Sequence, residues 1–186
     1  MIACVRPPAP PVLQEGAAKW TSRYVESNKR FTWPIVGAVP LNQLLLPALR
    51  GMTADHCAYC DTWPAQVTEE TIDHFRPKAS HRTLAFEWEN LFLACHGCQK
   101  EKHDQFGDLL LNPSDARYSF EAYFIVNYAD GTLEPNPAAT PHDQQRAKFT
   151  IELLGLNRRQ LPTARRSELR RAKDEAAGMD RPYRYL

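Results

Sequence analysis

The first third of the chain alternates between apolar and polar side chains with a helical period. Between residues 14 and 30 the apolar positions lie three or four residues apart, with charged side chains between them, which predicts a helix. Leucines at every fourth position over residues 41–50 predict a second helix, which Pro47 would shorten or kink. The proline-rich residues 1–13 are expected to form an extended arm in front of an N-terminal helical region over residues 14–54.

Two short segments in the middle of the chain have the composition of β-strands. Residues 67–75 and 88–94 are rich in β-branched and aromatic side chains and have the length of strands. A short helix is expected to begin near Cys98. Both strands lie within residues 55–106, which also hold most of the histidines and four of the five cysteines. This segment is therefore the expected functional module.

A hairpin is predicted over residues 118–134. The segment begins with an aromatic and β-branched run, YSFEAYFIVNY, which is typical of strands. The dipeptide Asp130-Gly131 follows this run and is a strong signal for the turn of a hairpin.

Helical patterns dominate the rest of the C-terminal region, residues 107–186. Thr140 and Pro141 predict the start of a helix, with the threonine as its cap and the proline at its first position, and Gly155 is expected to end it. Residues 163–177 show a helical pattern again. The sequence as a whole predicts a small α+β protein that folds as one compact domain.

The composition is that of a soluble globular protein. Of the 186 residues, 43% are hydrophobic and 24% are charged, which allows one packed domain. The formal net charge is +1, so no acidic or basic field dominates the molecule. Any binding of nucleic acid must then depend on local clusters of cations.

The sequence predicts neither a membrane protein nor a secreted one. No apolar stretch approaches the roughly 20 residues that are needed to span a bilayer. Residues 1–13 are too short and too rich in proline for the core of a signal peptide. We therefore expect a cytoplasmic protein.

Four of the five cysteines form two close pairs of the CxxC type, Cys57 with Cys60 and Cys95 with Cys98. Two such turns supply the four tetrahedral thiolate ligands of a structural zinc ion. The odd cysteine, Cys4, argues against a secreted disulfide framework. Two alternatives stay open: the pairs could be buried or redox cysteines, and His96 could replace one thiolate.

A zinc site with four cysteines holds a fold together but has no open position for chemistry. The 34 residues between the two pairs exceed what a zinc ribbon needs, and they contain the dipeptide Asp73-His74. Hydrolysis of a phosphodiester needs a base for water, for which an imidazole is suited, and a hard cation, which carboxylates bind. A lone histidine or aspartate is more simply structural, so the pair is informative only in its context.

That context is the order CAYC, TIDHFRPK, WENLF and ACHGCQKEK over residues 57–104. It resembles the zinc-bearing form of the HNH endonucleases, also called ββα-metal or treble-clef nucleases. The resemblance implies that His74 is the general base that activates water and that Asp73 binds a catalytic Mg²⁺ or Mn²⁺. It also implies that Asn90 fastens the loop between the two strands and so orients the base. The four paired cysteines match the structural zinc ligands.

The third ligand of the catalytic ion departs from the family pattern. The family usually has Asn or His directly after the last cysteine, where this chain has Gln99. Glutamine offers a carbonyl oxygen on a longer arm, and His103, one helical turn further on, is an alternative ligand. Lys102 matches a lysine of the family motif that would contact phosphate, although a solvated helix lysine is an equal alternative. Phosphate contacts are also expected from Arg76 and Lys78.

A softer similarity extends over most of the chain. The segments VRPPAPPVL, ALRGMTADHCAYC, LLLNPSD and TIELLGLNRRQL resemble the HNH component of Septu-type anti-phage systems, which also occurs in some retrons. This resemblance implies DNA or RNA as the substrate and an ABC-type ATPase as a partner. The chain contains no Walker A sequence, so the ATPase would be a separate protein.

Two functions from different classes are consistent with these patterns. The first is a metal-dependent endonuclease in which water activated by His74 attacks a phosphodiester. The second is a zinc-stabilised module that binds nucleic acid or protein without cutting, and Gln99 is the feature that favours it. A run of cations over residues 157–173 could hold a nucleic-acid backbone, but an ordinary solvated helix face explains it equally well.

Overall fold

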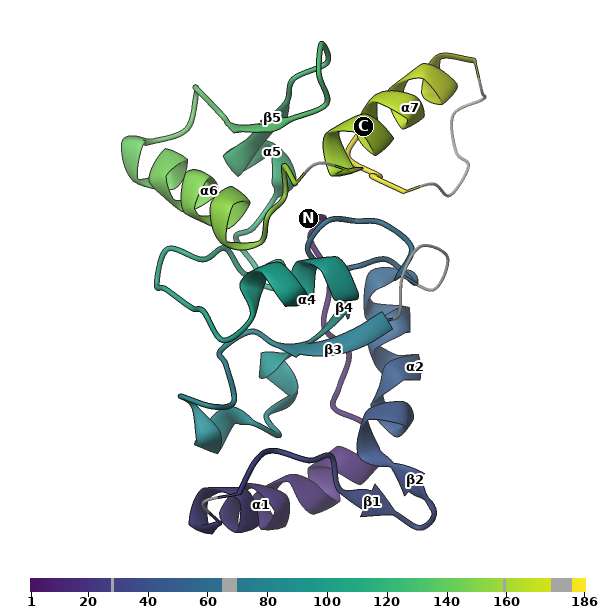
Figure 1. Ribbon diagram of the computed structural model, residues 1–186, viewed down its shortest axis with the longest axis vertical. Helices are drawn as coiled ribbons and strands as arrows, with labels where there is room; N and C mark the ends of the chain where they lie inside the picture. The colour runs from purple at the N-terminus through teal and green to yellow at the C-terminus, as the bar shows by residue number, and fades with distance from the viewer. Residues whose placement is uncertain (28, 65–69, 159, 175–181) are drawn as a thin grey trace.

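The computed structural model describes residues 1–27, 29–64, 70–158, 160–174 and 182–186. The molecule is elongated, with the N-terminal helix at one end, a central strand pair in the middle and the C-terminal hairpin and helices at the other end (Figure 1). Within the described residues the strands form three separate antiparallel pairs among the helices. The predicted α+β class is therefore confirmed.

The two N-terminal helices lie where the apolar periodicity predicts them, α1 over Pro11–Glu26 and α2 over Leu41–Thr53. Pro47 lies inside α2 without ending it. A short hairpin of β1 (Ile35–Val36) and β2 (Val39–Pro40) separates the helices and was not predicted. Two residues per strand are too few for a pattern of alternation.

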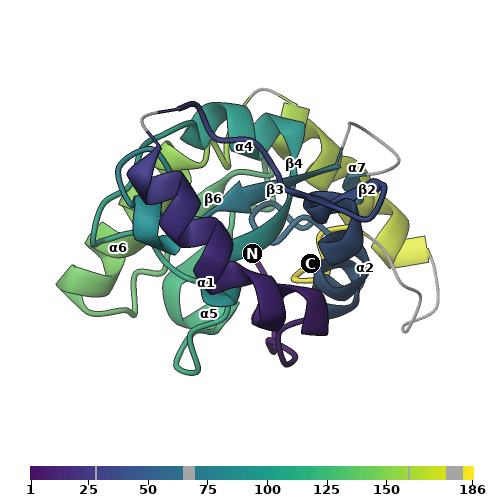
Figure 2. The same ribbon diagram turned by 90° about the horizontal axis from the view of Figure 1, so that it is seen from below.

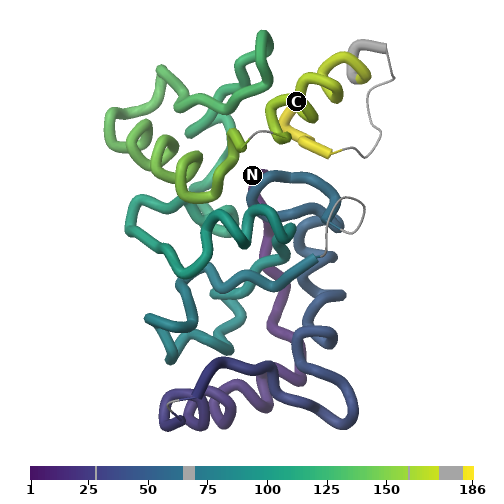
Figure 3. The backbone as a smooth tube through the Cα atoms, viewed as in Figure 1, coloured from purple at the N-terminus to yellow at the C-terminus, as the bar shows by residue number. Residues whose placement is uncertain are grey.

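The proline-rich arm is bound along the centre of the molecule (Figure 3), but only residues 1–10 lie outside helices, because residues 11–13, which were predicted as part of the arm, form the start of α1. Arg6 donates through Nη1 to the carbonyls of Trp88 at 2.7 Å and Leu91 at 2.9 Å. Its guanidinium also lies 4.4 Å from the centre of the Phe92 ring, a cation–π contact. The indole Nε1 of Trp88 donates to the carbonyl of Pro7 at 2.8 Å. The arm is thus part of the core that supports the central strands.

The central strand pair consists of β3 (Glu70–His74) and β4 (Leu91–Cys95), which run antiparallel with His74 opposite Leu91. The strand predicted over residues 67–75 is confirmed from residue 70, and residues 67–69 lie outside the described part. Residues 88–90 were predicted as strand but form a 3₁₀ turn, η2 (Trp88–Asn90). The turn forms because the N–H of Asn90 bonds the carbonyl of Glu87.

A helix follows the central strands directly. The predicted short helix is α4 (His96–Lys102), and it packs against β3 and β4 on the side away from α2. The loop between the strands contains a second 3₁₀ turn, η1 (Arg82–Leu84), against which α1 packs (Figure 2). Each face of the strand pair is therefore covered by a helix, and β4 is buried along its whole length.

The C-terminal hairpin is shorter than predicted. Its strands are β5 (Phe124–Val126) and β6 (Leu133–Pro135), joined through the expected Asp130-Gly131 turn, where Gly131 has a φ of 79°. The preceding residues form a helical turn, α5 (Phe120–Tyr123), instead of strand. The side chain of Ser119 caps this turn by accepting from the N–H of Ala122, and this local bond overrides the β propensity of the aromatic run.

Two further helices complete the chain. Thr140 caps α6 (Pro141–Leu153) as predicted, because its hydroxyl accepts from the N–H of Asp143 at 3.1 Å. The predicted pattern over residues 163–177 lies in α7 (Gln160–Asp174), and residues 175–177 are outside the described part. None of the described helices combines the length and the apolar character that a transmembrane span requires.

One fully buried arginine joins the C-terminal elements. Arg165 of α7 donates to the carbonyl of Leu156 at 2.7 Å and to that of Gly131 at 3.2 Å. It also donates to the hydroxyl of Tyr185 at 2.8 Å and to Oδ1 of Asn157 at 3.3 Å. Its charge is therefore surrounded by acceptors from the turn of the hairpin, the connection between α6 and α7, and the last residues described.

Replacement of this arginine should destabilise the protein strongly. We expect Arg165→Ala to lower the free energy of unfolding by about 3 kcal/mol or more, because it leaves several buried acceptors without a donor. Urea unfolding measures the change. Arg166→Ala, at the exposed neighbouring position, should change it by less than about 0.5 kcal/mol. Equal effects of the two substitutions would contradict this role of Arg165.

Candidate active site and metal centre

Four buried cysteine sulfurs meet where β4 joins α4. The Sγ atoms of Cys57, Cys60, Cys95 and Cys98 all lie within 4.8 Å of one another. Those of Cys60 and Cys95 are 3.6 Å apart, close to the edge of about 3.8 Å in a tetrahedron with zinc–sulfur bonds of about 2.3 Å. The predicted ligands are thus brought together as free cysteines, and the donor set fits a structural zinc ion.

Each cysteine pair is shaped by a tight turn. The N–H of Cys57 donates to the carbonyl of Thr62 at 2.7 Å, and that of Asp61 donates to the carbonyl of Cys57 at 2.9 Å. In the second pair, Cys95 caps α4, and its Sγ accepts from the N–H of Cys98 at 3.4 Å. The sulfur at this helix N-terminus is favoured as a thiolate by the backbone dipoles.

A cation from the C-terminal region contacts the sulfurs. The guanidinium of Arg158 lies 3.3 Å from the Sγ of Cys98 and 3.5 Å from that of Cys95. Burial alone would lower the pKa of Arg158, but the nearby sulfurs of Cys98 and Cys60 raise it overall. A divalent ion with four thiolates carries excess negative charge, and this guanidinium offsets part of it. Gly97 leaves room for the contact, because a Cβ there would lie 2.7 Å from the guanidinium.

The loop between β3 and β4 is fastened from inside by Asn90. Its Oδ1 accepts from the N–H of Arg76 at 2.7 Å, and its Nδ2 donates to the carbonyls of Arg76 at 3.0 Å and Leu84 at 2.9 Å. These three bonds hold the loop between β3 and β4 closed, and the role in catalysis that the resemblance implies for this asparagine stays a prediction. The next residue after Leu84 is Ala85, whose carbonyl contacts His74.

His74 is buried, with 3% of its surface exposed. Its Nε2 lies 2.9 Å from the carbonyl oxygen of Ala85, which can only accept, so the proton is on Nε2 and Nδ1 is unprotonated. No described residue forms a hydrogen bond with Nδ1. The ring packs against Phe31 and stacks on Trp33, with centroids 5.2 Å and 5.5 Å apart. Burial, with a contribution from Lys78, lowers the pKa of His74 to about 3, so it is neutral at pH 7.

Asp73 is also buried but contacts different residues, because side chains alternate along a strand. Its Oδ2 accepts from the hydroxyl of Tyr59 at 2.7 Å and lies 3.1 Å from Nζ of Lys102. Burial raises the pKa of Asp73, while Lys102 and Tyr59 oppose this shift. No hydrogen bond or ion pair within the described part of the chain engages Oδ1, which leaves that oxygen for a cation.

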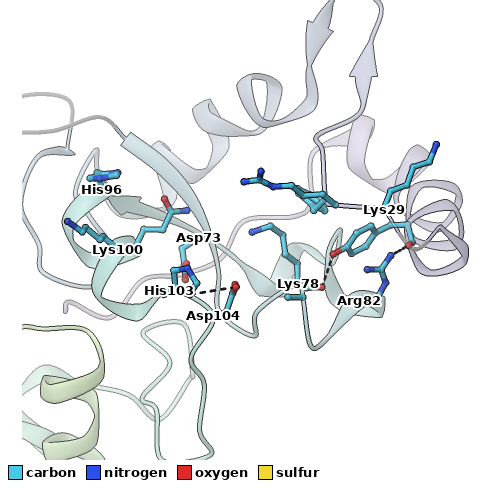
Figure 4. A pocket seen from close by; sticks show the side chains of 13 residues that line it. Lys29, Asp73, Lys78, Arg82, His96, Lys100, His103 and Asp104 are labelled. Carbon is cyan, nitrogen blue, oxygen red and sulfur yellow. Dashed lines mark hydrogen bonds and ion pairs between the residues drawn. The ribbon is translucent and has the colours of Figure 1, made fainter.

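A pocket of about 700 Å³ lies beside Asp73, between α4, the loop after β3 and residues 29–31 (Figure 4). Asp73, Gln99 and His103 all line it. His74 does not line it and instead lies behind Phe31, whose ring lines the pocket and packs on the imidazole. The structure therefore brings the predicted metal ligands to one pocket but covers the predicted base.

The two candidates for the third ligand differ in their contacts. Gln99 donates through Nε2 to the carbonyl of Ile72 at 3.3 Å, which turns its amide toward β3. His103 follows α4 as an exposed residue, with its Nδ1 3.7 Å from Oδ2 of Asp104. Both residues reach the pocket, so the choice between them stays a prediction.

The three predicted phosphate contacts lie in different places. Lys78 lines the pocket, with its Nζ 5.3 Å from the centre of the Phe31 ring. Arg76 is exposed over the ring of Phe106 and does not line the pocket. Lys102 is fully buried, because its ammonium serves as the counterion of Asp73 and donates to the carbonyl of His74 at 2.7 Å. In this conformation Lys102 therefore contacts the carboxylate and not solvent.

Residues 57–105 match the family model of the HNH endonucleases. This segment, the HNH module, contains both cysteine pairs, the β3–β4 pair and α4. The resemblance inferred from the sequence motifs is thereby confirmed for these residues.

Two relatives extend the similarity beyond the HNH module. The Septu protein PtuB of Bacillus thuringiensis is 30% identical over 120 residues, which cover 61% of this chain and 42% of that protein. A Vibrio cholerae protein named "Retron Vc95 putative HNH endonuclease" is 23% identical over 141 residues, which cover 70% of this chain and 66% of that protein. The chain therefore spans less than half of the first relative and about two thirds of the second.

The metal centre leads to a prediction about Arg158. Native mass spectrometry should detect one tightly held zinc ion, and Arg158→Gln should release it to a chromophoric chelator about tenfold faster, because the thiolate charge is then less well balanced. Arg170→Gln, an exposed position on α7, is the matched control and should behave as wild type. A folded, zinc-free wild-type protein would exclude the zinc site, and equal release from both variants would exclude the role of Arg158.

Proposed function

We propose that this chain is a metal-dependent HNH endonuclease that hydrolyses phosphodiester bonds of nucleic acid, with His74 as the general base. The observation that carries the proposal is the state of the imidazole, since the Ala85 carbonyl holds the proton on Nε2 and leaves Nδ1 unpartnered among the described residues. A neutral, unprotonated nitrogen is suited to accept a proton from water. The family match of residues 57–105 supports this reaction class.

The pocket residues support a role for a catalytic cation. Mg²⁺ or Mn²⁺, when bound, would neutralise charge on the phosphate and on the leaving oxygen. Asp73, through Oδ1, and either Gln99 or His103 are the residues that would hold it, and all three line one pocket. Lys102 and Tyr59 fix the orientation of the carboxylate through Oδ2.

The base and the carboxylate must face the same space for this reaction. Phe31 lines the pocket and packs on His74, and Trp33 stacks on the same imidazole, so opening the base to the pocket would require these rings to move. Phe31 and Trp33 precede the HNH module in the sequence. Exposure of the base would therefore require no change in the β3–β4 pair.

The proposed biological setting is anti-phage defence in the cytoplasm, with a separate ABC-type ATPase as the partner. Support comes from the similarity to a Septu protein and to a retron protein, which covers 61% and 70% of this chain. Both values exceed the share of the chain that the HNH module occupies, so the similarity extends into the regions that flank the module. The motifs of the proline-rich arm and of the segment around α6 agree with this setting.

A second candidate function is binding without cleavage. The cover of Phe31 and Trp33 over His74 favours it, because the imidazole has no access to the pocket in this conformation. Gln99, at a position where the family usually has Asn or His, also favours binding without cleavage.

Substitution of the base separates the two functions. With Mg²⁺ or Mn²⁺, the wild-type chain should nick supercoiled plasmid or cut labelled RNA, and His74→Ala should slow cleavage by about 100-fold or more, because the water loses its base. His142→Ala, at an exposed position on α6, should cleave as wild type. Cleavage that survives in His74→Ala would refute the assignment of the base. If the wild type cuts neither DNA nor RNA even with the ATPase present, the result contradicts the nuclease and favours the binding module.

The third ligand can be assigned by titration with the metal ion. Of Gln99→Ala and His103→Ala, the one that removes the ligand should raise the Mn²⁺ concentration for half-maximal cleavage by about tenfold or more, since an oxygen or nitrogen donor is lost. The other variant serves as the control and should titrate as wild type. If both titrate as wild type, neither residue is the ligand.

A further inference from the structure

One wall of the pocket comes from outside the HNH module. Lys29 and Arg30 line the same pocket as Asp73, although they belong to the segment between α1 and β1. Both side chains are exposed. Figure 4 shows Lys29 at the opposite side of the pocket from Lys100, with Lys78 between them.

The pocket concentrates positive charge in a chain of nearly neutral composition. Its lysines and arginines include Lys29, Arg30, Lys78 and Lys100. Two carboxylates, those of Asp73 and Asp104, also line it, but Asp73 is already paired with the buried Lys102. The pocket is therefore locally cationic, whereas the formal charge of the whole chain is +1. A field of this kind attracts a polyanion.

Several other cationic side chains already have partners within the fold. Arg158 contacts the cysteine sulfurs, and Arg165 is surrounded by backbone and side-chain acceptors. Arg82 lines the pocket, but its guanidinium donates to the carbonyls of Tyr24 and Ser27. In contrast, no hydrogen bond or ion pair within the described part of the chain engages the side chains of Lys29, Arg30 or Lys100. These three cations are available to a ligand.

The segment that carries Lys29 and Arg30 is anchored to the HNH module on both sides. Before it, Arg82 donates to the carbonyl of Ser27 at 2.5 Å, and the hydroxyl of Tyr24 donates to the carbonyl of Lys78 at 3.1 Å. After it, the ring of Phe31 packs on the imidazole of His74, with centroids 5.2 Å apart, and on the ring of Phe86, with centroids 5.4 Å apart. The two cations are thus held at the rim of the pocket by contacts that do not use their own side chains.

We propose that Lys29 and Arg30 form the second half of a phosphate clamp, which holds the backbone of DNA or RNA between themselves and Lys100 of α4. The identity of this ligand rests on the proposed function. Phosphate contacts of lysine and arginine position a nucleic acid and carry no sequence information. The clamp therefore presents a phosphodiester to Asp73 whatever its sequence, and the HNH module alone contains only one side of it.

Binding measurements in a His74→Ala background test the clamp without cleavage. Kd values are measured by fluorescence anisotropy at several salt concentrations, with labelled duplex DNA, single-stranded DNA and single-stranded RNA. Lys29→Glu/Arg30→Glu should raise Kd by about tenfold or more. It should also reduce the slope of log K against log salt by about 1.8 for duplex or about 1.4 for a single strand, because two phosphate contacts are lost. The nucleic acid that shows this change is the ligand of the clamp.

One charge-matched variant and one conservative exchange control this result. Lys19→Glu/Arg23→Glu makes the same change of charge at exposed positions of α1 that do not line the pocket, and it should bind as the background protein does. The conservative exchange Lys29→Arg/Arg30→Lys should also retain binding. Thermal unfolding confirms that each variant is folded. If Lys19→Glu/Arg23→Glu weakens binding equally, the effect is one of net charge and the clamp is excluded.

A rival surface and the cleavage assay complete the test. If Arg166→Glu/Arg170→Glu on α7 abolishes binding while the Lys29/Arg30 variant binds normally, the nucleic acid lies on α7 and the clamp is wrong. If the wild type cleaves in a way that depends on His74 while the Lys29→Glu/Arg30→Glu variant binds normally, this result also refutes the clamp, but it leaves the proposed nuclease intact. Binding that depends on Lys29 and Arg30 without any cleavage supports the clamp and refutes the nuclease.

Discussion

The close approach of four cysteine sulfurs is the constraint on which the rest of the structure depends. Buried sulfurs within 4.8 Å of one another cannot all carry negative charge unless a cation lies between them. Burial raises the pKa of Cys57, so the bare cluster would hold a protonated thiol there, whereas a zinc ion favours the thiolate. The cluster also gathers distant parts of the chain. Arg158 contacts it from the C-terminal region, and Arg184 forms an ion pair at 2.6 Å with Asp61, directly after the first cysteine pair.

The positions of Asp73, His74 and Lys102 depend on this cluster. Because Cys95 caps α4, the cysteine cluster fixes the start of the helix that ends at Lys102. Lys102 then contacts both the carboxylate of Asp73 and the carbonyl of His74, so one ammonium fixes two consecutive residues of the strand. A zinc ion bound by the four sulfurs would hold the start of this helix in place, and with it the counterion of a buried carboxylate. The structural metal and the proposed chemistry are thus coupled through the backbone, although they have no ligand in common.

Features that depend on local chemistry could be predicted from the sequence. The CxxC pairs and the Thr140 cap each involve a residue type with a strong local preference, whereas the role of Asn90 in its loop was implied only by the resemblance to the HNH family. Features that depend on distant contacts could not be predicted. The run of cations over residues 157–173 was expected either to hold a nucleic-acid backbone or to form a solvated helix face. Arg158 and Arg165 do neither, because sulfurs and carbonyls from other segments bind their side chains. Lys29, Arg30 and Phe31 likewise reach the pocket only through tertiary packing, which no pattern near the HNH motif encodes.

The hydrogen bonds of Arg82 connect α1 to the loop that contacts the candidate base. Arg82 belongs to the same short loop as Ala85, whose carbonyl sets the tautomer of His74. The guanidinium of Arg82 donates to the carbonyls at the end of α1. Hydrogen bonds therefore connect α1 to the loop and the loop to the imidazole. The position of α1 and the hydrogen bond that holds the proton on Nε2 of His74 thus depend on the same short loop.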